Sequence, residues 1–197
     1  ATGNKVNTIF EEKNDKWVEP EQDAVFIPNS TTDFIYASER NGFMNLYKYN
    51  TSGEMIWQVT NFKFPVTEIL GFDKDVQNVF VKATGADGRE MHLFQVSLFS
   101  GRFAQITKKK GVHDFKISDD GTCFIDDFTS LTVPREISII NLRKRKPTII
   151  FTAENPLKDY KIGVTELMTL KSKDGFDLHC RMIKPADFDS TKKYPVL

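Results

Sequence analysis

The chain has 197 residues, of which 27 are basic and 27 acidic, so its formal net charge at pH 7 is zero. This balance gives no electrostatic reason to expect binding to nucleic acid or to an anionic membrane surface. Hydrophobic residues make up 40% of the chain, enough for a substantial core, but no apolar run approaches the roughly 20 residues that would span a membrane.

The first segment, residues 6–12 (VNTIFEE), predicts the last strand of a sheet whose other strands would precede Ala1. Trp17, in the loop that follows, is interpreted as a packing anchor, and Glu19 and Glu21 as exposed acids that face a cavity or water. The start of the chain has neither a basic region nor an apolar run typical of a signal peptide, so we expect any targeting segment to lie outside this sequence.

The stretch from residue 33 to residue 60 predicts three short strands joined by two tight turns. Gly42 and Gly53 occupy the turns, where glycine easily adopts a positive φ. The apolar run just before it, residues 24–27, predicts a fourth strand of the same unit.

This unit recurs twice along the chain, and corresponding strands start at Phe34, Val79 and Cys123, which are 45 and 44 positions apart. A period of this length with four strands per repeat is typical of β-propeller blades. The sequence therefore predicts three four-stranded blades. Their strands are expected at 24–27, 34–37, 46–49 and 55–59, then at 66–72, from 79, at 91–96 and 103–107, and finally at 112–117, from 123, at 137–140 and 148–152.

Two apolar triplets, residues 25–27 and 79–81, are expected to be buried on both faces of their sheets, as stacked blades require. The basic run 108–110 is interpreted as a solvated turn. Cys123 and Cys180 are expected to be small buried residues that do not pair with each other.

A search for chemistry finds no G-x-S-x-G, H-E-x-x-H, C-x-x-C or G-x-G-x-x-G motif in the sequence. The three histidines, His92, His113 and His179, are widely spaced and interpreted as structural. Asp126 and Asp127 could do acid–base work, but without a nucleophile or metal partner a turn role is favoured for them. We therefore expect no metal site and no cofactor site in this chain.

The blade pattern ends near Thr152, and residues 154–160 have the polar, proline-containing composition of a linker. Strands are then predicted at 165–171 and 176–183, joined by a turn at Asp174-Gly175. Residues 194–197 are interpreted as the start of a further strand. The predicted division is a propeller part at 1–158 and a second domain at 159–197.

Several segments carry a resemblance to a known family: SERNGFMNLYKY, GVHDFKISDDG, DDFTSLTVPREISI and, most specifically, LKSKDGFDLHCRMIKPADFDSTKKYPVL. Together they resemble the dipeptidyl peptidase IV branch of the prolyl oligopeptidase family, in which a propeller caps an α/β-hydrolase domain. The fold that the resemblance implies is all-β here: about three propeller blades, followed by the first strands of the hydrolase domain.

The resemblance also implies a serine exopeptidase that removes dipeptides from peptide N-termini and prefers Pro or Ala at the second position. The family's catalytic triad would lie downstream of Leu197, and the paired Glu residues that hold the substrate amine upstream of Ala1. No catalytic residue is therefore assigned within the chain, which is expected to be inactive on its own. The alternatives are a non-catalytic propeller that binds peptides or proteins, and an acylaminoacyl or oligopeptidase relative.

The resemblance further implies a periplasmic or extracellular parent protein that acts on peptide substrates as a homodimer. Three blades of a larger ring would expose the apolar faces of the two terminal sheets. We therefore expect the chain, taken alone, to self-associate through these faces.

Overall fold

The computed structural model describes residues 8–19 and 24–196. These residues form fourteen β-strands and no helix, and accordingly none of them forms a helix long and apolar enough to cross a membrane. The strands are β1 (Val25–Phe26), β2 (Asp33–Ser38), β3 (Asn45–Asn50), β4 (Met55–Gln58), β5 (Val66–Phe72), β6 (Asn78–Ala83), β7 (His92–Ser97), β8 (Phe103–Gln105), β9 (Val112–Ile117), β10 (Cys123–Thr129), β11 (Glu136–Asn141), β12 (Lys146–Thr152), β13 (Thr165–Lys171) and β14 (Asp177–Ile183).

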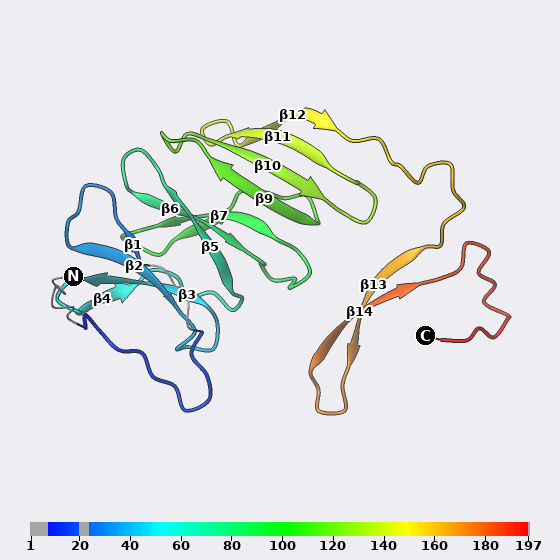
Figure 1. Ribbon diagram of the computed structural model, residues 1–197, viewed down its shortest axis with the longest axis horizontal. Coiled ribbons are helices and arrows are strands. Elements are labelled where there is room, and N and C mark those ends of the chain that lie inside the picture. The colour runs from blue at the N-terminus through cyan, green and yellow to red at the C-terminus, as the bar shows by residue number, and fades with distance from the viewer. Residues whose placement is uncertain (1–7, 20–23, 197) are drawn as a thin grey trace, which may run out of the picture.

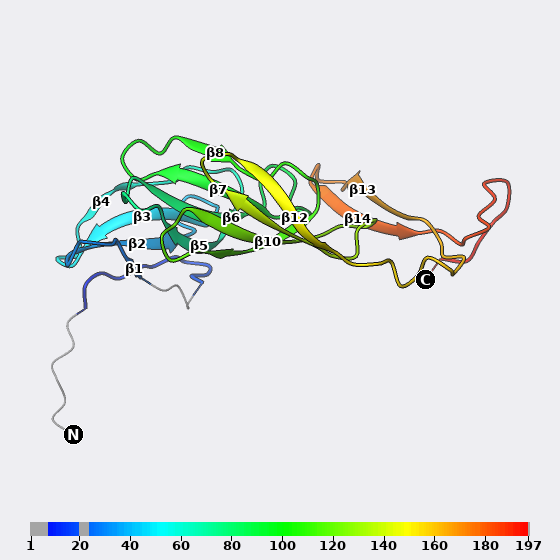
Figure 2. The ribbon, with the colours of Figure 1, turned by 90° about the horizontal axis from the view of Figure 1, so that it is seen from above.

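The first twelve strands make three four-stranded antiparallel sheets, β1–β4, β5–β8 and β9–β12, in which each strand pairs with its neighbour in sequence. The sheets lie side by side and fan outward from their first strands (Figure 1). Seen from above, they stack face against face (Figure 2). This arrangement confirms the prediction of three β-propeller blades, and the observed strand bounds differ from the predicted ones by no more than two residues.

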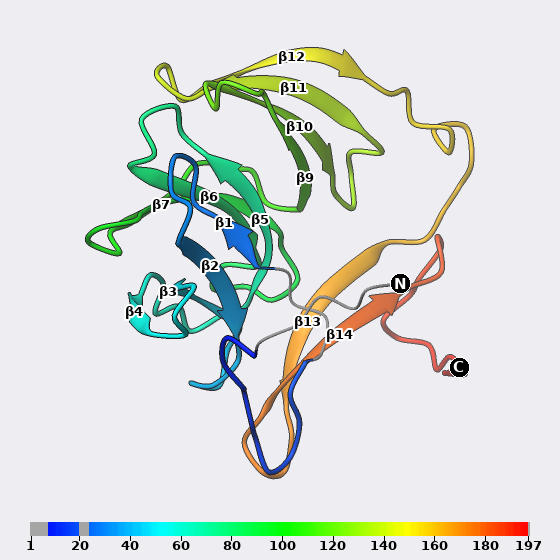
Figure 3. The same ribbon diagram turned by 60° about the vertical axis from the view of Figure 1, so that its left-hand side comes forward.

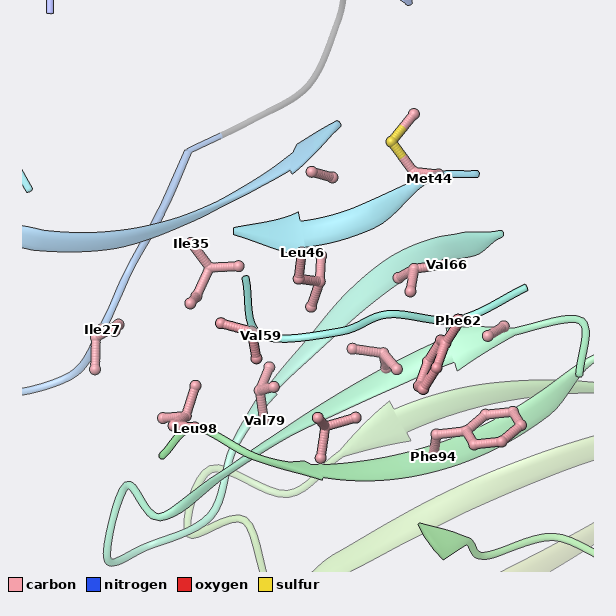
Figure 4. Close-up of a cluster of buried hydrophobic side chains, with 14 residues drawn as sticks. Ile27, Ile35, Met44, Leu46, Val59, Phe62, Val66, Val79, Phe94 and Leu98 are labelled. Atoms are coloured by element: carbon pink, nitrogen blue, oxygen red, sulfur yellow. The ribbon is translucent and has the colours of Figure 1, made fainter. Parts of the chain in front are cut away.

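The sheet β5–β8 is buried on both faces because a sheet stacks on each side of it. Val79, Phe80 and Val81 are all fully buried. Val79 and Val81 join the cluster shared with the first sheet (Figure 4), whereas Phe80 packs at 4.9 Å, in ring-centroid distance, against Phe124 of the third sheet. The period-two alternation of a strand thus supplies both interfaces from consecutive residues.

The expectation of two-sided burial is wrong for residues 25–27. Phe26 is 51% exposed, although Ile27 is buried. The far face of the first sheet is covered only in part: Phe10 stacks on Tyr49 with a centroid distance of 4.5 Å, but Phe26 lies beyond this cover.

Two predicted strands are absent. Residues 8–12 form no strand, and 6–7 lie outside the described residues; residues 194–196 likewise form no strand. An extended segment counts as a strand only when a neighbour accepts its backbone hydrogen bonds, and neither segment has such a neighbour in the described structure. Phe10 instead anchors the first segment through its aromatic ring.

The second and third sheets are joined through their backbones as well as their side chains. The Met91 amide donates to the Gly111 carbonyl at 3.0 Å, and the His113 amide donates to the Met91 carbonyl at 3.2 Å. An ion pair of 2.8 Å between Lys82 Nζ and Asp114 Oδ1 reinforces the contact. These bonds hold β7 against β9 at the interface between the two blades.

The hairpin β13–β14 forms a separate two-stranded sheet, which turns at Gly175 with φ of 85°. It extends away from the three blades (Figure 3) and approaches them near Gly88, where a Cβ would lie 3.8 Å from His179 Nε2. The division of the chain at residues 158 and 159 stays a prediction.

Candidate functional site

The third sheet brings together a serine, a histidine and an aspartate, the residue types of a serine hydrolase triad. His113 on β9 and Ser138 on β11 both lie beside Asp126, which is on the strand between them. All three are buried, with exposed fractions of 2%, 3% and 5% respectively. These three side chains are the ones that nucleophilic catalysis uses, so their geometry decides whether they can act as a triad.

The geometry shows a structural hydrogen-bonded pair rather than a catalytic triad. His113 Nδ1 lies 2.8 and 3.0 Å from the two Asp126 oxygens, and its Nε2 lies 2.8 Å from the Lys109 carbonyl oxygen. A catalytic base needs Nε2 free to take the serine proton, but here that atom faces a carbonyl that only accepts hydrogen bonds. His113 therefore cannot act as the base for Ser138, and no other histidine in the described part of the chain contacts this serine.

His92 makes a second buried contact at the same blade interface. Its Nε2 lies 2.8 Å from Glu90 Oε2, and its Nδ1 lies 3.1 Å from Thr107 Oγ1, which also accepts from the Leu93 amide. Both ring nitrogens of His92 therefore have a polar partner. The rings of His92 and His113 are 5.4 Å apart.

These contacts bear out the structural interpretation of His92 and His113. His179 is exposed on β14, where its Nδ1 lies 3.3 Å from Thr169 Oγ1. The basic run 108–110 is exposed between β8 and β9, as expected for a solvated turn, although Lys109 also bridges to Glu136 at 2.9 Å.

The turn role expected for Asp126 and Asp127 is wrong, because both lie within β10. Alternation sends Asp126 into the blade interface and Asp127 to the outer face, where Arg135 Nη2 donates to it at 2.6 Å. Ser130 does lie in a turn, in which its amide donates to the Val133 carbonyl at 3.0 Å.

The cysteines are both unpaired, as expected, but each is only partly buried. Cys123 begins β10 and Cys180 lies in β14, on strands that carry an exposed face. Their prediction as fully buried residues is therefore wrong.

The packing role expected for Trp17 is also wrong. Its side chain is 65% exposed, and its indole nitrogen donates to Glu19 Oε2 at 3.2 Å. Trp17 lines a hollow of about 30 Å³ with Glu12 and Arg40. Glu19 is exposed, as expected, while Glu21 lies outside the described residues.

Arg40 organises the aromatic face of the first sheet beside this hollow. Its Nη1 donates to the Tyr49 hydroxyl at 2.6 Å, and its guanidinium lies 4.3 Å from the centroid of the Tyr47 ring. Burial raises the pKa of Tyr47, whose hydroxyl finds no partner among the described residues. Glu12 Oε1 lies 3.4 Å from Arg40 Nη2. The guanidinium of Arg40, the two tyrosines and Glu12 thus form one polar network.

A turn between β6 and β7 contains a strongly shifted carboxyl group. Arg89 donates to both oxygens of Asp87 at 2.8 Å and holds the pKa of Asp87 far below its usual range. The positive charge of His179 adds a smaller effect in the same direction. Because the paired Asp87 remains ionised, it is a poor proton donor, and it stabilises the turn instead.

Two larger cavities lie at the interface of the second and third sheets, and no local sequence pattern indicates either. One has a volume of about 510 Å³ and is lined by Arg89, Lys110 and Ser130, with Leu167 of the hairpin at its edge. The other has a volume of about 290 Å³ and contains His113, Asp126 and Ser138. Within the described ranges, no cluster of three or more His, Cys, Asp or Glu residues could hold a metal ion.

The sequence matches a family model described as the dipeptidyl peptidase IV (DPP IV) N-terminal region over residues 1–135. It is 27% identical to human dipeptidyl peptidase 8, over 96% of this chain and 25% of that protein. It is also 23% identical to dipeptidyl peptidase 4 of Arthroderma otae, over 99% of this chain and 26% of that protein.

Solved structures give the same result for the fold. A crystal structure of a Bacteroides ovatus protein assigned as a dipeptidyl aminopeptidase IV superposes with a TM-score of 0.83 at 32% identity, over 92% of this chain and 29% of that one. The dipeptidyl peptidase 4 of Porphyromonas gingivalis superposes with a TM-score of 0.77 at 23% identity, over 87% of this chain and 24% of that one. The chain thus spans about a quarter of the length of the relatives it matches.

Proposed function

We propose, from the premise that this chain belongs to the dipeptidyl peptidase IV family, that it contributes propeller blades to a serine peptidase that removes dipeptides from peptide N-termini. The observation that carries the proposal is the 32% identity and TM-score of 0.83 with the Bacteroides ovatus structure, over 92% of the chain. The preferred substrates would carry Pro or Ala at the second position.

The part of the reaction that these residues perform is scaffolding and restriction of access, not bond cleavage. Among the described residues, the one Ser-His-Asp grouping has its histidine committed to Asp126 and to the Lys109 carbonyl. The nucleophile and its base would come from a hydrolase domain, for which β13 and β14 supply the first strands. A propeller stacked in this way is rigid enough to restrict which peptides reach such a domain.

The proposal extends to a peptide-processing homodimer in the periplasm or outside the cell, as the family resemblance implies. The location is tested by fractionating cells that express the tagged full-length protein. Recovery from the periplasm or medium supports it, and recovery with the cytoplasm contradicts it. Sedimentation of the same protein measures whether it is a dimer.

The activity is tested with the full-length protein that contains these residues and a chromogenic dipeptide amide with Pro in the second position. We expect release of the chromophore, and loss of this release when the substrate amine is acetylated, because an exopeptidase must bind the free amine. Cleavage of the acetylated substrate or of internal bonds would instead support an acylaminoacyl or oligopeptidase activity.

The second candidate function is a propeller that binds peptides or proteins without cleaving them. The exposed Trp17 beside Glu19 favours it, because an accessible indole beside a carboxylate suits recognition of an amine-bearing peptide. Binding without release of any chromophore, together with the absence of a G-x-S-x-G motif after Leu197, would favour this alternative.

A further inference from the structure

We propose that the cavity of about 290 Å³ between the second and third sheets binds a small carboxylate with an apolar body. The cavity is lined by the segment after β8 on one side and by residues of β9 to β12 on the other. Pockets that bind small molecules are of this size or larger, with mostly apolar walls and a few polar groups that orient the ligand.

The walls of the cavity are apolar. Ile106 lies on the side of the second sheet, and Phe128, Ile140 and Pro147 lie on the side of the third. Ile140 and Phe128 are buried, so this wall is held in place by the core of the blade. Such walls favour a ligand with an aromatic or branched aliphatic body over a bare inorganic anion.

The floor of the cavity offers a hydroxyl group. Ser138 is 3% exposed and lines the cavity. Its hydroxyl can donate a hydrogen bond to the oxygen of a ligand that enters the cavity. The nearby Asp126 does not repel that oxygen strongly, because both carboxylate oxygens are paired with His113.

The rim of the cavity carries two cations, Lys108 and Arg145, that form no ion pair within the described residues. Arg145 is positioned across the mouth by its Nη2, which donates to Gln95 Oε1 of the second sheet at 3.1 Å. The third rim cation, Lys109, is neutralised by Glu136, with both oxygens 2.9 Å away. Two cations without an ion pair and a hydroxyl donor in the same lining favour a carboxylate over a neutral or cationic group.

The test is a calorimetric titration of the full-length protein with phenylacetate, and with phenethyl alcohol and phenethylamine as neutral and cationic counterparts. We expect the acid to bind about fivefold or more tightly than the alcohol, because it alone interacts with the rim cations, and the amine to bind weakest. Raising the salt concentration should weaken binding of the acid but not of the alcohol. Equal affinity for the acid and the alcohol would overturn the proposal.

Variants locate the binding to this cavity. Arg145 has a positive φ of 49°, so Arg145→Asn removes the charge with a residue that tolerates this conformation. Together with Lys108→Gln, it should weaken phenylacetate binding about tenfold, whereas Lys144→Gln, in the same turn but outside the cavity lining, should leave it unchanged. Unchanged affinity in the double variant, or no binding by the wild type, would overturn the proposal. If Arg145→Asn impairs folding, Lys108→Gln and Ser138→Ala each test it alone.

Discussion

At the scale of single residues, the blade interface shows how two neighbouring histidines are held by different sets of partners. His113 lies between the Asp126 carboxyl group at Nδ1 and the Lys109 carbonyl oxygen at Nε2. His92, with its ring centre 5.4 Å away, lies between the Thr107 hydroxyl and the Glu90 carboxyl group. Each ring is therefore fixed in place by polar contacts at both of its nitrogens.

Substituting Asp126→Leu should lower the free energy of unfolding by about 1 to 3 kcal/mol, because it leaves the buried Nδ1 of His113 without its hydrogen-bond partner. The double substitution His113→Phe with Asp126→Leu should recover most of this loss, since it removes both polar groups. Urea denaturation of the chain measures both values. Asp119→Ala, at an exposed turn, should change the free energy by about 0.5 kcal/mol or less.

Acidification should weaken the turn that Asp87 and Arg89 stabilise. Arg89 holds the pKa of Asp87 below its usual range, so this contribution to stability is complete above the pKa of the unfolded carboxyl, about 3.9, and is lost as the pH falls toward the lower pKa of the folded state. Asp87→Asn should therefore lose less stability than the wild type when the pH falls from about 5 to about 2. Asp174→Asn, at an exposed turn without an ion pair among the described residues, should follow the wild type. Parallel curves for Asp87→Asn and the wild type would contradict this assignment.

At the scale of strands and turns, the glycines that have a positive φ differ in how much space surrounds them. Gly42 has φ of 94° and open space where a Cβ would point. Gly111, just before β9, has φ of 145°, and a Cβ there would lie 2.4 Å from the Thr129 carbonyl oxygen and 2.7 Å from the Phe128 ring. Gly42 is required only for its positive φ, whereas Gly111 is also required because a Cβ would clash with β10.

Gly111→Ala should consequently destabilise the protein more than Gly42→Ala. The cost for Gly42→Ala is about 1 to 2 kcal/mol, from the left-handed backbone alone. Gly111→Ala adds a clash that the backbone of β10 must move to relieve, and it disturbs the bond from the Met91 amide. Thermal unfolding compares the two variants directly, and equal losses would show that β10 moves without cost.

The strands were predictable because apolar periodicity and glycine turns are local signals. The repeat from Phe34 to Val79 to Cys123 fixes three units, and β5, β9 and β13 begin and end as predicted. Side-chain burial was less predictable, since it depends on what stacks on each sheet. The burial of Trp17, Phe26, Cys123 and Cys180 was mispredicted for this reason. Asp126 and Asp127 were instead mispredicted because β10 continues past them to Thr129.

The cavity beside Ser138 was not predictable from sequence, because its lining comes from five separate segments that only the stacking of two blades brings together. The one local signal was the basic run that contains Lys108. A charged run alone is typical of a solvated turn. The run indicates a binding site only when the structure shows that Lys108 lines the same cavity as Arg145, which is bonded to Gln95.

At the scale of the whole molecule, stacking buries most of β6 and β7 in the middle sheet and leaves the outer faces of its neighbours exposed. On the third sheet, Ile125 and Ile139 lie opposite each other in adjacent strands and are 47% and 39% exposed. On β12, Phe151 lies opposite Ile137 on the same face and is 49% exposed. An apolar face of this kind ordinarily contacts another protein surface.

We propose that the chain, taken alone, self-associates through this face. Replacing Ile125 and Ile139 with Lys should shift it toward the monomer in sedimentation experiments, because charges resist burial between sheets. Phe99→Lys, at a turn where Phe99 is 67% exposed, is the matched control and should not change the association state. A wild-type chain that sediments as a monomer at all concentrations would contradict the proposal.

The pairing of every strand with its neighbour in sequence also has a consequence for biosynthesis. Each sheet can close as soon as its fourth strand leaves the ribosome, without waiting for distant parts of the polypeptide, so the entropic penalty of long loops is avoided. Translation would then add one finished sheet to the previous one. The nascent protein would need chaperones chiefly to shield the newest sheet until the next is complete.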